Sequence, residues 1–132
     1  MKTKQNQNNW VSIKGESYVF KRLVESGLSP EWVAFSNRRS SADIIVNGKT
    51  VDVKTSKLHK YNPYKTGFFS FNFHHHGKKQ ENIDFFICLC EDINKLFVFP
   101  GHLLKTKTII ISERQLDRGK FDFFEENWDL LK

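Results

Sequence analysis

Two aspartates stand on either side of a predicted β-hairpin and have the chemistry of metal ligands. The dipeptide Asn47-Gly48 strongly favours a two-residue hairpin turn, and in that register Asp43 lies directly opposite Asp52. Their Cβ atoms are then about 5 Å apart on one face of the sheet. Two carboxylates at that distance destabilise a fold unless a proton, a lysine or a divalent cation compensates their repulsion. A hard cation such as Mg²⁺, which takes oxygen ligands, compensates them best.

A lysine and a glutamate extend this candidate site. Lys54 follows Asp52 by two residues, so both side chains project from the same face of the strand. Glu16 falls on the apolar face of an expected helix, where a carboxylate is costly unless it is paired or binds a metal. If that helix packs on the sheet, Glu16 can reach the two aspartates. The four residues could then hold a metal, orient a water and stabilise charge on a phosphate.

Each member of the set also has a plainer explanation when it is taken alone. Asp52 and Lys54 fit a solvated strand face, and Asp43 fits a surface position beside a turn. Glu16 fits a helix start at which its carboxylate reaches solvent. The hairpin register, the shared face and the helix offset are three separate coincidences, however, and together they favour a metal site.

The hairpin resembles the core motif of the PD-(D/E)xK nuclease superfamily. Asp43 is followed, after eight residues, by Asp52-Val53-Lys54, which is the spacing of the motif. Gly15-Glu16 in the preceding helix is similar to the acidic residue found in many members, including archaeal Holliday-junction resolvases. The resemblance covers about residues 12–100, with specific motif content at 15–57. It departs from the motif at Ala42, where the family pattern has proline.

This resemblance implies both a fold and a reaction. The fold would be an α/β, restriction-endonuclease-like αβββαβ core, and the reaction would be hydrolysis of phosphodiester bonds with Mg²⁺, for which Mn²⁺ would substitute. Asp43 and Asp52 would bind the metal, and Glu16 would bind it directly or through water. Lys54 would position the attacking water or stabilise the pentavalent phosphorane.

The remaining pattern predicts a single domain, residues 1–132, with a mixed central sheet flanked by helices and a flexible start at residues 1–9. Residues 11–26 follow the helical period, and Ser112 with Gln115 predicts an N-cap that opens a helical region reaching Leu131, interrupted at Gly119. Strands are expected at residues 32–36, 42–46, 49–55, 68–73, 84–90, 95–99 and 108–111.

The charge of the chain points to a nucleic-acid partner. Twenty-one Lys and Arg against fifteen Asp and Glu give a net charge of +6, which favours a polyanion. Residues 53–80 contain six lysines and no acidic residue, as expected of a loop that clamps a phosphate backbone, although an ordinary lysine-rich surface loop also fits. The residues expected to contact DNA are Arg38, Arg39, Lys57, Lys60, Lys65, His74, His76, Lys78, Lys79 and Gln80.

Several classes of protein are disfavoured. No apolar run approaches the roughly 20 residues that span a bilayer, and the first nine residues lack the apolar stretch of a secretory signal. Cys88 and Cys90 alternate along one expected strand and cannot form an ordinary disulfide. We therefore expect a cytoplasmic protein without a membrane partner. The apolar surplus in residues 113–132 fits either packing on the core or a dimer interface. We expect a homodimer, which would supply two active sites for the two strands of a duplex.

Two classes of function fit these observations. The first is a Mg²⁺-dependent DNA endonuclease. Its substrate would be a branched junction of the Holliday type, a specific duplex site of the restriction or homing type, or damaged or flapped DNA. The second is a non-catalytic nucleic-acid-binding module, which accounts for the charge but leaves Asp43 opposite Asp52 unexplained. A nuclease that acts on RNA also fits.

Overall fold

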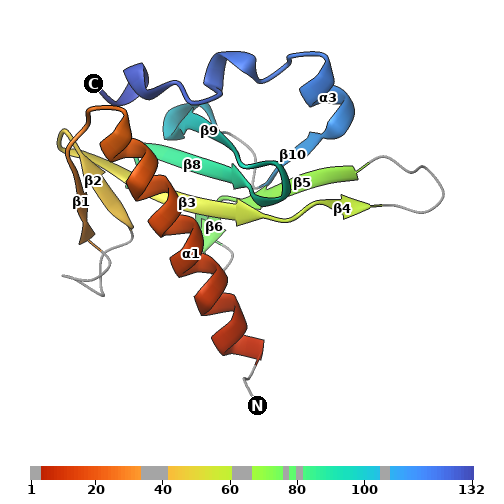
Figure 1. The fold of residues 1–132 in the computed structure, drawn as a ribbon, viewed down its shortest axis with the longest axis horizontal. Helices are drawn as coiled ribbons and strands as arrows, with labels where there is room; N and C mark the ends of the chain where they lie inside the picture. Colours follow the sequence, from red (N-terminus) through yellow and green to blue (C-terminus); the bar gives the residue numbers. More distant parts are fainter. Residues whose placement is uncertain (1–3, 34–41, 61–66, 76–77, 80–81, 105–107) are drawn as a thin grey trace.

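The computed structural model describes residues 4–33, 42–60, 67–75, 78–79, 82–104 and 108–132, with residues 4–13, 74–75 and 78–79 described by their backbone. Helix α1 (Lys4–Glu25) crosses one face of a five-stranded sheet, and the last part of the chain runs along one end of that sheet (Figure 1). The helix begins at Lys4 rather than at Val11, so most of the polar start is helical.

The central sheet is mixed, as the sequence predicted. Its strands are β1 (Pro30–Trp32), β2 (Ile44–Val46), β3 (Lys49–Ser56), β8 (Phe85–Cys90) and β9 (Lys95–Pro100), in the order β1-β2-β3-β8-β9. Neighbouring strands are antiparallel except β3 and β8, which are parallel. A short 3₁₀ turn, η1 (Glu91–Ile93), joins β8 to β9. The expected α/β class is therefore confirmed.

The connection between β3 and β8 contributes strands to a second, smaller sheet and does not form the expected helix. This sheet contains β4 (His59–Lys60), β5 (Gly67–Asn72) and β10 (Thr108–Ser112), in the order β10-β5-β4, and a separate pair is formed by β6 (His74–His75) and β7 (Lys78–Lys79). The αβββαβ pattern would place a helix in this connection, but every named element of its described residues is a strand. The reason lies in β5, where burial alternates with a period of two rather than with the helical period.

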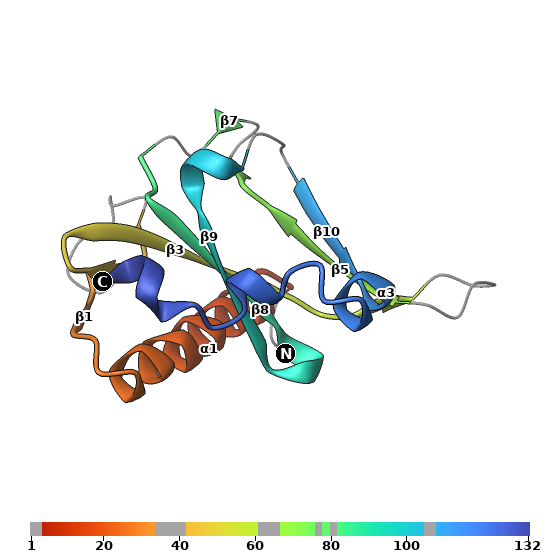
Figure 2. The ribbon, with the colours of Figure 1, turned by 90° about the horizontal axis from the view of Figure 1, so that it is seen from above.

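Each face of the central sheet has its own apolar core. Val19 and Leu23 of α1 pack on one face, against residues such as Val51 of β3. Phe69 and Phe71 of β5 pack on the other face. Figure 2 shows this arrangement, with β5 and β10 lying side by side across the sheet from α1. Because side chains alternate along β3, a residue of this strand faces either the helix or the second sheet.

The C-terminal segment is less helical than predicted. Ser112 does cap a helix, since its Oγ accepts from Gln115 N at 3.1 Å while its own N–H donates to Gln115 Oε1 at 3.0 Å. That helix, α3 (Glu113–Asp117), is short, and Gly119 follows with φ of +73°. The prediction of a long helical region is wrong because the aromatic residues beyond Gly119 divide between the two cores. They lie in or beside two 3₁₀ turns, η3 (Asp122–Phe124) and η4 (Trp128–Leu131); a third, η2 (Gly101–Leu103), follows β9.

Much of the apolar surplus that suggested a dimer interface is therefore used within the chain. Phe121 and Phe124 pack against the core under the second sheet, and Trp128 and Leu130 pack against the core under α1. The pattern no longer argues for a homodimer, although Phe123 stays exposed.

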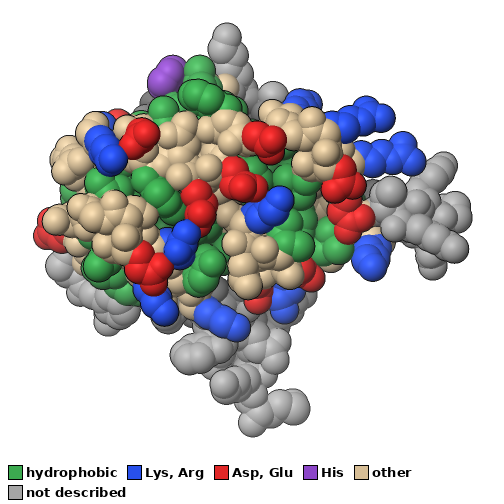
Figure 3. All heavy atoms as spheres, turned by 45° about the horizontal axis from the view of Figure 1, so that its top comes forward, with side chains coloured by type: hydrophobic (Ala, Val, Ile, Leu, Met, Phe, Trp, Pro, Cys, Tyr) green, Lys and Arg blue, Asp and Glu red, His purple; other side chains and the backbone are tan. Residues whose placement is uncertain are grey.

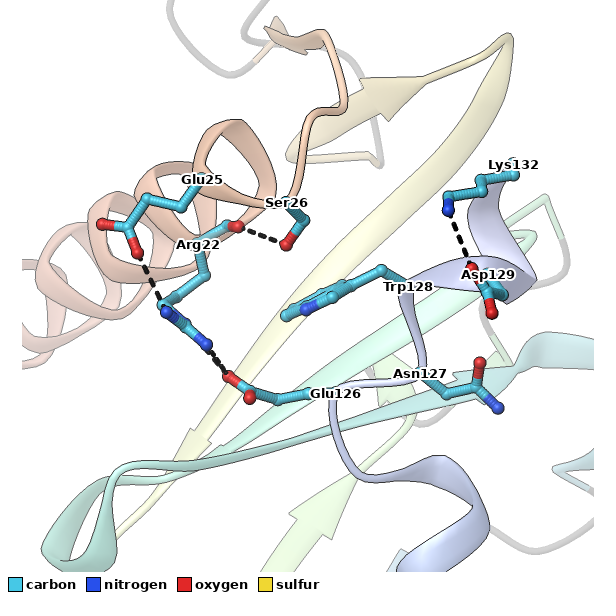
Figure 4. A pocket seen from close by; sticks show the side chains of 8 residues that line it. All are labelled: Arg22, Glu25, Ser26, Glu126, Asn127, Trp128, Asp129 and Lys132. Carbon is cyan, nitrogen blue, oxygen red and sulfur yellow. Dashed lines mark hydrogen bonds and ion pairs between the residues drawn. The ribbon is translucent and has the colours of Figure 1, made fainter.

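Ion pairs and hydrogen bonds connect the end of the chain to α1 and to the β2–β3 hairpin. Arg22 Nε donates to Glu126 Oε1 at 3.0 Å, and the same guanidinium pairs with Glu25 (Figure 4). Asn47 Nδ2, in the hairpin turn, donates to the carbonyl of Leu131 at 2.9 Å. The Asn47 hydrogen bond holds the hairpin turn against the end of the chain, while Arg22, Glu25 and Glu126 border a polar hollow of about 380 Å³.

Candidate functional site

The turn that precedes the candidate site has the predicted geometry. Asn47 and Gly48 have φ of +52° and +75°, as a type I′ turn requires at both central positions. Val46 pairs with Lys49 and Ile44 pairs with Val51, so the predicted register is confirmed over the length of β2.

The first aspartate lies where this ladder is distorted. Asp43 precedes β2, and its N–H donates to the carbonyl of Val51 at 2.9 Å, although Val51 is already the partner of Ile44. Two successive residues thus face one, as at a β-bulge, a device that re-aims side chains. The side chain of Asp43 also makes a backbone contact, because its Oδ2 accepts a hydrogen bond from Val53 N at 2.8 Å. The ladder stops one residue short of the predicted Asp43–Asp52 pair, but the two carboxyl groups still meet.

The pKa of Asp43 reflects the proximity of the Asp52 carboxyl group. Burial, followed by the charge of Asp52 and a hydrogen bond to the Asp52 carboxyl, raises the pKa of Asp43 from 3.8 to about 8. The Val53 N–H opposes this rise, and the charge of Glu16 adds to it. At neutral pH Asp43 therefore holds a proton that is shared towards Asp52, and a cation that binds both carboxylates must displace it.

Asp52 and Lys54 form a buried ion pair beside Asp43. Lys54 Nζ lies 2.9 Å from Asp52 Oδ2, with side-chain exposures of 23% and 8%. The contact lacks hydrogen-bond geometry, and Asp52 Oδ2 is a buried oxygen without a directed donor among the described residues. An oxygen with this unused capacity is suited to a metal ion, which needs only a lone pair.

Helix α1 supplies the third carboxylate because it approaches β3 closely. A Cβ at Gly15 would overlap Thr55 Oγ1, so only glycine allows this contact without a shift. The next residue, Glu16, is 8% exposed and near enough for its charge to raise the pKa of Asp43. Asp43 thus lies within electrostatic range of both Glu16 and Asp52, and Asp52 in turn pairs with Lys54.

These residues fit a Mg²⁺ ion of the type that relies partly on water. Among the described residues, no group of three or more His, Cys, Asp or Glu side chains is placed to enclose a metal. Mg²⁺ is usually held by one or two carboxylates together with waters and substrate phosphate, and the carboxyl groups of Asp43 and Asp52 would be enough for such a site. A protein-only cage is therefore not required.

One neighbour of the site could not be expected from the sequence. Cys88 is the register partner of Lys54 on β8 and shares its face. Burial raises the pKa of the Cys88 thiol well above its ordinary value, with further contributions from Cys90 and Asp52. Both cysteines are free and buried, as expected for core residues. Only the parallel pairing of β3 with β8 reveals that Cys88 borders the ion pair.

The predicted DNA contacts are only partly placed. Lys57 and Lys60 are exposed at and just before β4, close in sequence to Lys54. His74, Lys78 and Lys79 belong to the short strands β6 and β7, in which the backbone of His74 pairs with that of Lys79. Arg38, Arg39, Lys65, His76 and Gln80 lie outside the described residues.

The C-terminal segment offers a poor surface for DNA. Residues 113–132 carry six acidic side chains against four basic ones. Figure 3 shows acidic and basic side chains interspersed on the face that includes this segment. None of the four site residues lines the polar hollow beside it.

Comparison with known proteins supports the architecture. The chain is similar to a solved structure of a bacterial homing endonuclease, I-Ssp6803I, with a TM-score of 0.64 over 98% of this chain and 91% of that one. The sequence identity is 16%, so the likeness concerns the fold. No family model matches the chain, and no curated protein matches it by sequence. None of the helices among the described residues has the length and apolar character needed to cross a bilayer.

Proposed function

We propose that this chain is a DNA endonuclease that hydrolyses phosphodiester bonds with Mg²⁺, or Mn²⁺ in its place. The observation that carries the proposal is the meeting of two partly desolvated carboxyl groups, Asp43 and Asp52, beside the ammonium of Lys54. A strongly raised pKa beside a specific charged partner is typical of a functional site. The similarity of the fold to a homing endonuclease supports DNA as the substrate.

Each side chain has a distinct role in this proposal. Asp43 and Asp52 would each give one oxygen to the ion, and Glu16 would hold one of its waters. The bound ion would polarise a phosphate oxygen and lower the pKa of an attacking water. Lys54, already 2.9 Å from Asp52, would stabilise the negative charge that develops on the phosphate. Asp43 would release its proton as the site is loaded.

Two kinds of DNA substrate fit this site equally well. A sequence-specific duplex agrees with the homing endonuclease to which the fold is similar. A four-way junction agrees with the motif shared with junction resolvases. Because one domain of this size supplies one site, cutting both strands would require two copies, and we propose a homodimer for that step.

The test is cleavage of supercoiled plasmid and of a synthetic four-way junction, with Mg²⁺, with Mn²⁺ and with EDTA. We expect the wild type to cut with either metal and not with EDTA. Asp52→Asn should bind DNA without cutting it, whereas Asp129→Asn, which alters a carboxylate that is 83% exposed, should cut normally. A wild type that binds DNA but cuts no form of it with either metal would instead be a non-catalytic binding module.

A further inference from the structure

The outward face of β5 and β10 is partly exposed and has an unusual composition. Burial alternates along β5, and inward residues of both strands, such as Phe69, Phe71 and Ile111, are fully buried. The alternate positions face away from the core and pair across the two strands. We call these positions the outer ribbon face; they are Phe68, Ser70 and Asn72 on β5 and Thr108, Ile110 and Ser112 on β10.

None of these six side chains is charged, although 27% of the residues in the chain are Asp, Glu, Lys or Arg. The outer face of a sheet that meets only water usually carries Lys, Glu or other charged residues. Depletion of charge at an accessible surface is instead typical of the centre of an interface. Ile110, in the middle of β10, is 56% exposed and gives this face an apolar centre. The outer ribbon face therefore has the composition of a binding surface.

We propose that the outer ribbon face reads base edges in the major groove of duplex DNA. This inference rests on the proposed endonuclease function and locates its sequence specificity. Because β4 pairs only with Gly67 and Phe68, the rest of β5 forms a two-stranded antiparallel ribbon with β10. Such a ribbon fits the major groove, which is about 12 Å wide. The amide of Asn72 matches adenine, the hydroxyls of Ser70 and Thr108 can bond several bases, and Ile110 can contact the methyl group of thymine.

The charge around this face favours DNA over a protein partner. Residues 56–60, which lead into and include β4, contain two lysines and no acidic residue. Lys57 and Lys60 are exposed beside the end of the ribbon, where His59 stacks on Phe68 with ring centroids 5.3 Å apart. Lysines that hold phosphates beside uncharged side chains that meet bases are the two components of sequence-specific recognition.

The ribbon is also fixed with respect to the proposed catalytic strand. Ser70 N, in the middle of β5, donates to Ser56 Oγ at 3.0 Å, and Ser56 is a buried residue of β3, two positions beyond Lys54. Phe69 and Phe71 anchor the same strand in the core. A rigid link of this kind would set a constant spacing between the bases that are read and the phosphate that is cut.

The experiment is selection from a library of duplexes with a randomised central segment, in EDTA so that no metal-dependent cleavage occurs. We expect the wild type to enrich a defined sequence. Asn72→Ala and Ile110→Ala should each relax the preference at one position, by about tenfold, without lowering affinity for unrelated DNA. Lys60→Ala should weaken all sequences alike and reduce the salt dependence of binding. Phe123→Ala, a change at an exposed apolar residue of the C-terminal segment, should leave the enriched sequence unchanged.

Several results would overturn this inference. A wild type that binds DNA but enriches no sequence lacks the proposed reading surface, while its endonuclease activity can still stand. An enriched sequence that survives both ribbon substitutions would mean that another surface reads it. If Ile110→Ala abolished self-association in sedimentation without altering DNA preference, the face would be a protein interface. Failure to bind any DNA would refute the proposed function as well. Unchanged circular dichroism of each variant controls for folding.

Discussion

Replacement of Asp43 by asparagine should stabilise the metal-free protein at alkaline pH. An acid whose pKa is raised on folding binds its proton more tightly in the folded state. The free energy of unfolding then falls as pH rises from the unfolded pKa, here 3.8, to the folded value, here about 8, and is constant above it. Because asparagine does not titrate, Asp43→Asn removes this pH-dependent loss of stability. Its amide can still accept the Val53 N–H, and its NH₂ group can donate to Asp52 as the protonated acid does.

The size of the effect follows from the same pKa values. The rise from 3.8 to about 8 corresponds to roughly 6 kcal/mol at about 1.4 kcal/mol per pKa unit. Asp43 is only half-buried, and solvent screening reduces the expected difference to about 2–3 kcal/mol at pH 9. For a domain of this size that is a rise in Tm of about 8–10 °C. At pH 4 the two proteins should have nearly equal stability.

Thermal unfolding followed by circular dichroism in EDTA, from pH 4 to pH 9, measures this difference directly. Asp129→Asn serves as the control, because its carboxylate is exposed and its stability should track that of the wild type throughout. The reasoning fails if Asp43→Asn is no more stable than the wild type at pH 9. It also fails if the advantage of the variant is the same at every pH, because a titrating carboxyl would then not be its source.

Three further substitutions test single parts of the structure. Lys54→Ala should lower the rate of DNA cleavage about 100-fold or more while Mn²⁺ binding persists, because the ammonium acts on developing charge rather than as a ligand; loss of Mn²⁺ binding would contradict this role. Gly15→Ala should force α1 away from Thr55, lowering stability by about 1–3 kcal/mol in chemical denaturation and slowing cleavage through Glu16; wild-type values of both would contradict the close approach. Ser112→Ala should cost about 1 kcal/mol through loss of the α3 cap with little effect on cleavage, and an unchanged unfolding midpoint would show that the cap adds nothing.

The hairpin was predictable because its signal is local. Asn47-Gly48 adopts the positive φ angles of a type I′ turn, and the turn fixes the register of β2 on β3. The distortion at Asp43 was not predictable, since it depends on a second hydrogen bond to Val51 and not on a turn signal. The spacing of Glu16 from the apolar residues of its helix predicted that its side chain faces the sheet. Gly15 explains how closely helix α1 can approach β3.

The second sheet and the C-terminal segment depend on contacts that are distant in sequence. The strand character of β5 was evident from its alternating phenylalanines, but its partner β10 lies beyond both β8 and β9 in the chain. The aromatic residues after Gly119 suggested one helix, whereas they serve two separate cores, and no periodic stripe can satisfy both. Local patterns thus predicted most strands and the catalytic candidates, while the long-range pairing and the outer ribbon face required the structure.

The most direct test of the central claim is a crystal structure of the wild type grown with Mn²⁺ and examined by anomalous scattering. We expect one anomalous peak between the carboxylates of Asp43 and Asp52, about 2.2 Å from an oxygen of each, and its loss in Asp52→Asn. Mn²⁺ bound only elsewhere on the chain, with the Asp43 and Asp52 carboxyl groups still hydrogen-bonded to each other, would refute the proposed metal site.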